Sequence, residues 1–182
     1  MAVNSITITI FILFIFVTEG ISKAVGTLSA NFIGSHDNRF INNTLLSAVK
    51  LQGYLGFIVA IPLLLFGKHT VALLVDIKSI SPFVLNEVMR SLGGLWLLFF
   101  LDGVSWSLVG ILTAGGDTKF IMLAKSTNVW VFQIPPIILL LGHLHFAPSA
   151  AFTYVSPFYG AVNLLIFYWR YKSDKWIKLQ VA

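Results

Sequence analysis

The chain has 182 residues, of which 57% are hydrophobic and 10% are charged, and its mean hydropathy is +0.88. Soluble domains carry about a quarter charged residues, so this composition indicates a membrane protein. The net charge is +5, but the basic residues gather at the ends of apolar runs, which is typical of membrane flanks and argues against a nucleic acid partner. The absence of cysteine excludes disulfides, a thiolate nucleophile and a Cys-based metal site.

Five apolar runs are long enough to cross the bilayer as helices, which takes about 20 residues each. Residues 6–10 alternate like a strand, but apolarity then continues without alternation, so a helix is favoured over a barrel. Residues 71–84 contain Asp76, Lys78 and Pro82 and are predicted to lie along the interface. The predicted fold class is an all-α membrane protein, a five-helix transmembrane bundle with crossings at about 4–34, 42–67, 86–114, 119–141 and 149–169.

The orientation follows from the basic residues near the ends of these crossings. Five crossings place the two termini on opposite sides of the membrane. One side has Arg39, Lys119, Arg170, Lys172, Lys175 and Lys178, and the other has Lys68, Lys78 and Arg90. The side with six basic residues is predicted to be cytoplasmic, which places the C terminus in the cytoplasm. We expect the membrane to be a bacterial inner (plasma) membrane. The N terminus would then lie outside, which suggests that something upstream is missing.

The first crossing carries two patterns on its surface. Glu19 and Lys23 are spaced i to i+4 with the acid first, so they are predicted to pair on one face. This pair is also a candidate for the functional cavity, although local neutralisation favours a structural role equally. Gly26, Ala30 and Gly34 recur every four residues and predict a stripe for close helix contact.

The central stretch, residues 99–119, holds one acid in the middle of a crossing. No charged residue lies three or four positions from Asp102, so its own helix cannot neutralise it. An ionised carboxylate at this depth costs at least about 2.5 to 3.5 kcal/mol. We therefore predict that Asp102 forms a binding site for a proton or a small cation, and Na⁺ is the only metal ion expected there. This functional role is favoured over the alternative, in which Asp102 is protonated and has only a structural role. Ser105 and Trp106 share its helix face and offer a hydroxyl and an aromatic surface for a cationic substrate.

Two other motifs carry weaker signals. His143 and His145 lie in a loop, and two histidines alone rarely make a metal site, so an interface position is favoured. The glycine-rich turn at residues 115–119 lacks a preceding strand and the Walker spacing, so nucleotide binding is rejected.

The order and spacing of these motifs resemble the multidrug and toxin extrusion (MATE) transporters. In that family a helix ends in a pattern like Gly-x-Leu-Arg-Gly-x-Gly-Asp-Thr before a helix with an internal proline. Here residues 110–118 read Gly-Ile-Leu-Thr-Ala-Gly-Gly-Asp-Thr, and Pro135 follows. Thr113 and Ala114 depart from the family's Arg and Gly. The corresponding turn comprises Gly115, Gly116, Asp117 and Thr118.

The resemblance implies a role for the chain and for its central acid. Asp102 matches an acidic residue of the family's tenth helix, a cation or proton site. The family has two six-helix lobes, and residues 1–182 resemble helices eight to twelve, a single partial transmembrane domain without the lobe's first helix. The expected function is part of a Na⁺- or H⁺-coupled antiporter, not an enzyme, that exports organic, often cationic, compounds. Its expected partners are membrane lipid, the organic substrate and a missing N-terminal lobe or partner chain, with no cofactor besides the coupling ion.

Two alternatives remain open at this point. A lipid-linked oligosaccharide flippase of the same superfamily would favour a cavity lined by several cations, and only Lys23 and Lys50 approach the interior. A truncated or scaffolding membrane protein would not transport at all. Because five helices cannot form the two-lobed unit, we expect no transport from the chain alone.

Overall fold

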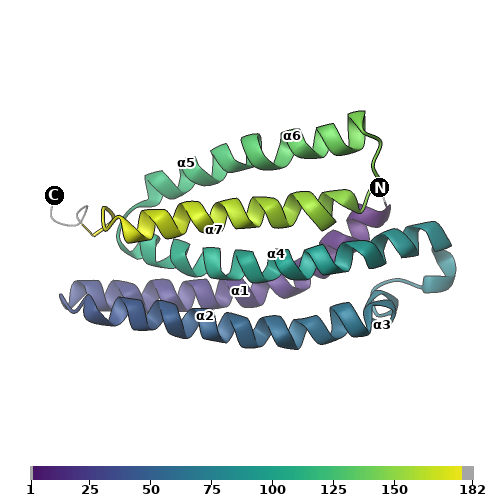
Figure 1. Ribbon diagram of the computed structural model, residues 1–182. Coiled ribbons are helices and arrows are strands. Elements are labelled where there is room, and N and C mark those ends of the chain that lie inside the picture. Colours follow the sequence, from purple (N-terminus) through teal and green to yellow (C-terminus); the bar gives the residue numbers. More distant parts are fainter. Residues whose placement is uncertain (1, 178–182) are drawn as a thin grey trace.

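The computed structural model describes residues 2–177, and within that range it contains helices and no strands (Figure 1). The elements in chain order are α1 Ala2–Gly34, α2 Arg39–Ala60, η1 Ile61–Leu65, α3 Gly67–Ala72, η2 Ile77–Ser79, α4 Pro82–Ala114, α5 Thr118–Asn128, η3 Val129–Gln133, α6 Ile134–Ile137, η4 Ile138–His143, η5 Ala151–Val155 and α7 Ser156–Lys172. Here η2 is a 3₁₀ turn and the other η elements are π-helical. The predicted all-α membrane bundle is confirmed.

Four stretches in the described residues are long and apolar enough to cross a membrane, at Val3–Gly34, Arg39–Leu65, Pro82–Ala114 and Ala151–Lys172. They correspond to four of the five predicted crossings. The remaining one, predicted at 119–141, is not a single helix of that length. It is built from α5, η3, α6 and η4, which follow one another without a gap and appear as one rod beside α7 in Figure 1. Pro135 and Pro136 lack the backbone N–H that a regular helix needs, which accounts for the break in α-helical bonding.

The segment between α2 and α4 does not extend along the bundle. It forms the short elements α3 and η2 at the end where α2 and α4 meet (Figure 1). Ser81 then starts α4, because its Oγ accepts a hydrogen bond from the Val84 N–H at 3.3 Å and Pro82 occupies the first turn.

Helix α4 is the centre of the bundle. It packs against α1, α2, α7 and η5. In the most apolar part of α4, 61% of the residues are buried inside the protein. The corresponding share is 28 to 39% in the other three stretches that are long enough to cross a membrane. Apolar cores lie toward both of its ends, one around Leu92 and Leu95 and the other around Leu108 and Ile111. The helix that carries Asp102 therefore lies at the centre of the packing among the described residues.

Helices α1 and α4 approach most closely at two glycines. A Cβ on Gly110 would lie 2.5 Å from the Ser22 carbonyl oxygen, and one on Gly26 would lie 3.3 Å from the Gly110 oxygen. The Ser22 Oγ also donates to the Trp106 carbonyl oxygen at 2.6 Å. Small residues thus allow the two backbones to touch.

The predicted small-residue stripe is wrong beyond Gly26. Ala30 is exposed, and a Cβ on Gly34 would meet nothing within 4 Å. A step of four residues overshoots the 3.6-residue turn, so such a stripe drifts around the helix. The face that meets α4 continues instead through the fully buried Ser29.

The turn between α4 and α5 is a helix C-cap built on glycine. Gly116 has φ +84°, a left-handed conformation that glycine adopts without strain. The Asp117 N–H donates to the Leu112 oxygen and the Gly116 N–H to the Thr113 oxygen, both at 3.0 Å. These are the two bonds of a Schellman motif, and they end α4 sharply.

The predicted division of basic residues matches the two ends of the bundle. The chain begins at one end and its last described residues lie at the other (Figure 1). The turns after α1 and α4 and the end of α7, which carry Arg39, Lys119 and Arg170, share one end. Lys178, counted with this group from the sequence, lies outside the described residues.

Replacing Gly110 with alanine is expected to destabilise the bundle, because the new Cβ would collide with backbone atoms of α1 that cannot rotate away. Overpacking of this kind costs about 1 to 3 kcal/mol. Gly93→Ala on the same helix is the matched control, since its Cβ would meet nothing within 4 Å. Thermal unfolding in detergent should show a lower Tm for Gly110→Ala alone. Equal Tm values would contradict the close α1–α4 contact.

Candidate functional site

A small cavity lies beside Asp102 in the interior of the bundle. Its volume is about 60 Å³. Three helices enclose it: α4 supplies four lining residues, α5 one and α7 three. The lining residues are Asp102, Ser105, Trp106, Val109, Lys125, Tyr159, Asn163 and Phe167. The acid therefore faces a space inside the protein.

The charged neighbour of Asp102 comes from α5. Lys125 interacts electrostatically with Asp102 and with Glu19 of α1. Its Nζ lies over the Trp106 ring, 3.1 Å from the ring centroid, as in a cation–π contact. The Trp106 side chain and the Asp102 carboxyl group line the same cavity. The Lys125 ammonium thus lies against the Trp106 ring, in a cavity that the Asp102 carboxyl group also lines.

Polar side chains of α5 and α7 close the other side of the cavity. The buried Asn128 donates from Nδ2 to Oδ1 of the buried Asn163 at 2.8 Å. Asn163 and Tyr159, one helical turn apart on α7, both line the cavity. The Ser105 Oγ is buried and has no hydrogen-bond partner among residues 2–177. An unpaired buried hydroxyl that lines a cavity beside a carboxylate calls for a ligand or water there.

The chemistry of the lining suits a small cation or a proton. The carboxylate, hydroxyl, amide and phenol groups provide oxygen donors, which hard cations prefer. A space of 60 Å³ can hold an ion or water, but pockets for organic ligands measure about 300 to 1,000 Å³. In this conformation the cavity therefore admits an ion and excludes an organic compound.

The structure brings together some of the residues singled out in the sequence and separates others. Ser105 and Trp106 line the same cavity as Asp102. The predicted Glu19–Lys23 pair is confirmed, with 3.8 Å between Oε2 and Nζ, but the two side chains are 40% and 78% exposed. Neither of the two is among the residues that line the cavity.

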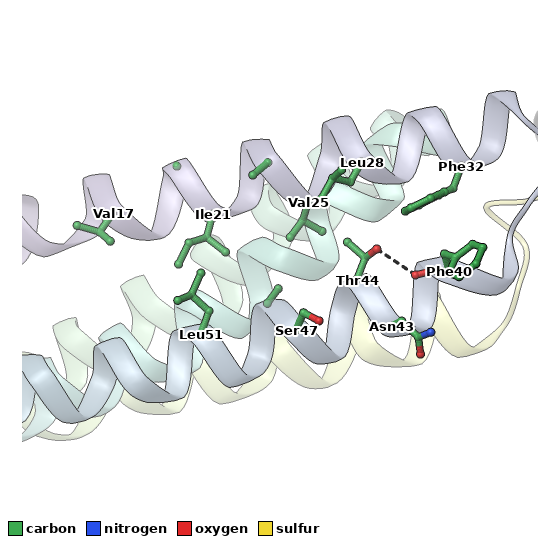
Figure 2. Close-up of a pocket in the computed structure, with 13 residues that line it drawn as sticks. Val17, Ile21, Val25, Leu28, Phe32, Phe40, Asn43, Thr44, Ser47 and Leu51 are labelled. Carbon is green, nitrogen blue, oxygen red and sulfur yellow. Dashed lines mark hydrogen bonds between the residues drawn. The ribbon is translucent and has the colours of Figure 1, made fainter.

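A larger apolar groove runs between α1 and α2, with a volume of about 580 Å³. Figure 2 shows Ile21 and Val25 of α1 facing Leu51 and Ser47 of α2 across it. Its size fits an organic ligand. None of its lining residues is charged, so a cation in this groove would have no counter-charge.

The comparison with known proteins decides the family. A family model described as MatE matches residues 1–139. The chain belongs to the MatE family. Neither a curated protein nor a solved structure matches it. MatE proteins are membrane transporters, so this is an integral membrane protein of a transport family. The match includes Asp102 and Lys125, whereas α7, with Tyr159 and Asn163, lies beyond it.

The glycine-rich turn of this MatE chain is held by a buried ion pair. Arg170 of α7 donates to both oxygens of Asp117, from Nε at 2.5 Å and from Nη2 at 3.1 Å. The two side chains are 15% and 5% exposed. The Arg170 guanidinium also lies over the Phe120 ring, 4.7 Å from its centroid. The turn thereby fixes the end of α7 against the start of α5.

Several residues of the site escaped the sequence analysis. Lys125 was not singled out as a site residue from the sequence, although it lies two turns inside α5. A signal was present, since it is the last charge before the uncharged run from Ser126 to Trp169. Asn128 and Asn163 are polar residues in predicted crossings, which is a functional or packing signal in a MatE helix. Their pairing across 35 positions has no sequence signature.

Breaking the Asp117–Arg170 pair should destabilise the protein far more than breaking an exposed pair. Arg170→Met leaves a buried carboxylate without its partner, which costs about 3 to 5 kcal/mol. Arg39→Met is the control, because the Arg39 side chain that bonds Asp37 is 87% exposed and such pairs contribute about 0 to 1 kcal/mol. Thermal unfolding should show a large drop in Tm for Arg170→Met only. Similar small decreases in Tm for both variants would contradict a stabilising role of the buried Asp117–Arg170 pair.

Proposed function

We propose that this chain is part of a cation-coupled antiporter that exports organic, often cationic, compounds, with Na⁺ or H⁺ entry as the driving reaction. One observation carries the proposal: Asp102, an acid in the middle of a membrane helix, faces a cavity of ion size between three helices, with oxygen donors around it. Intramembrane acids are expensive and mark ion or proton pathways. Membership in the MatE family supports multidrug or toxin efflux as the use of that site.

Asp102 is the proposed binding group for the coupling cation. The Ser105 hydroxyl, buried and unpaired, supplies a second oxygen, and Trp106 lines the same cavity beside the carboxyl group. A cation bound here shifts the transporter toward its inward-open or its outward-open conformation only if that conformation binds the cation more tightly than the other. Because the cavity is formed jointly by α4, α5 and α7, relative movement of these helices changes the affinity and couples the ion to transport.

The proposed setting is a bacterial inner membrane with the C terminus in the cytoplasm. The end of the bundle that carries Arg39, Lys119 and Arg170 supports this orientation, because cytoplasmic flanks are enriched in basic residues. Alternating access in transporters built from repeats is a movement of one half against the other. We therefore propose that the chain works together with a second lobe or a partner chain, with lipid around both.

In vesicles that hold the chain assembled with its second lobe or partner chain, Asp102→Asn should reduce efflux of an organic cation such as ethidium by at least tenfold, about 1.4 kcal/mol, and remove its dependence on an imposed Na⁺ or pH gradient. The amide keeps the shape but cannot balance a cation. Asp37→Asn, at an exposed turn, is the control and should behave like the wild type. Fluorescent efflux with each gradient applied separately gives the measurement and identifies the ion.

Unchanged efflux with unchanged ion dependence in Asp102→Asn would contradict the proposal. Movement of a labelled lipid-linked oligosaccharide across the same vesicles, without ethidium efflux, would instead support a flippase.

A further inference from the structure

Lys125 is the unexplained group of the site. It lies two turns inside α5, in a rod that continues into the apolar residues η3 to η4. Its ammonium is placed against an aromatic face and within electrostatic reach of a carboxylate, which is the environment that a bound cation needs. The site beside Asp102 therefore already holds a cation, and that cation belongs to the protein.

We propose that Lys125 is a tethered cation that occupies the Asp102 site when no external cation is bound, and that the coupling cation enters by displacing it. The inference rests on the proposed function and adds a competing group to it. The coupling cation and the lysine ammonium share one carboxylate, in a cavity of about 60 Å³. Two cations at such short range repel each other strongly in a medium of low dielectric constant, so their binding is mutually exclusive.

A second carboxylate attracts the Lys125 ammonium. Lys125 interacts electrostatically with Glu19 of α1 as well as with Asp102. Glu19 is only loosely engaged by Lys23, at 3.8 Å with both side chains partly or largely exposed, so it can accept another cation. The flexible lysine stem allows the ammonium to shift while α5 stays in place.

The exchange of Lys125 for an external cation would keep the Asp102 carboxylate neutralised throughout the transport cycle. The carboxylate must be neutralised when the site is empty as well as when it is loaded, because an unpaired charge inside the membrane is costly. With Lys125 as the internal substitute, the site keeps its charge balance in both states. The competition between the Lys125 ammonium and the external cation also sets the cation concentration that is needed to occupy the Asp102 site.

The first test measures the cation concentration for half-maximal ethidium efflux in vesicles that hold the chain assembled with its second lobe or partner chain. Lys125→Met removes the competitor at similar side-chain length, so half-maximal efflux should need about fivefold less Na⁺ or H⁺, the lower end of typical coupling factors. Lys50→Met on α2 is the control and should leave the value unchanged. An unchanged value in Lys125→Met would overturn the inference.

A chemical rescue separates charge from shape. The chain has no cysteine, so Lys125→Cys introduces a unique thiol. Reaction with 2-aminoethyl methanethiosulfonate forms a disulfide to a cationic arm close to lysine in length and releases the sulfinate. This should restore the wild-type concentration dependence, whereas the neutral methyl reagent should not. Equal effects of the two reagents would overturn the inference.

A third measurement stays informative even if no efflux is found. Brief acetylation of the purified protein, read by mass spectrometry, should label Lys125 several-fold faster relative to Lys50 in Asp102→Asn than in the wild type. Asp37→Asn should leave the ratio unchanged. Equal labelling of Lys125 in the wild type and in Asp102→Asn would overturn the inference that Lys125 occupies the Asp102 site. Faster labelling in Asp102→Asn, together with no ion-dependent efflux by the chain assembled with its second lobe or partner, would overturn the proposed function and leave the Lys125–Asp102 pairing intact.

Discussion

The structure depends on how one carboxylate is accommodated inside a membrane helix. Lipid cannot solvate an ionised acid, so Asp102 needs polar groups from other parts of the chain. They come from α5 and α7, whose Lys125, Tyr159 and Asn163 line the same cavity. Because α4 packs against α1, α2 and α7 at once, the acid is fixed at the centre of the bundle. Its position leaves it open to a space of ion size between α4, α5 and α7.

The geometry of this cavity is maintained from a distance. The buried Asp117–Arg170 pair fixes α7 against the turn between α4 and α5, and the Asn128–Asn163 hydrogen bond joins α5 to α7 closer to the cavity. On the other side, the contact of Gly26 with Gly110 sets the separation of α1 and α4. Three independent contacts therefore hold the helices that surround one acid, which explains how a broken rod such as α5 to η4 can still contribute a precisely placed lysine.

The sequence predicts what depends on local composition and spacing. The lengths of the apolar runs predict the helical bundle. Asp102 stands out in the sequence because no charged residue lies three or four positions away from it. The helical repeat placed Ser105 and Trp106 on its face. Contacts between distant residues were out of reach: the approach of Lys125 to Trp106 and the pairing of Asp117 with Arg170 depend on how helices pack, not on any pattern along one of them. The stripe beyond Gly26 failed for the same reason, since spacing alone does not say which face of α1 meets α4.

The central claim is that the Asp102 cavity binds a single cation, and equilibrium binding tests it most directly. The purified protein would be titrated with ²²Na⁺, and in a parallel sample proton uptake after a small acid pulse would be followed with a pH-sensitive dye. The account predicts that the wild type takes up one more cation per chain, Na⁺ or H⁺, than Asp102→Asn does. Equal uptake of both ions by the two proteins would contradict it.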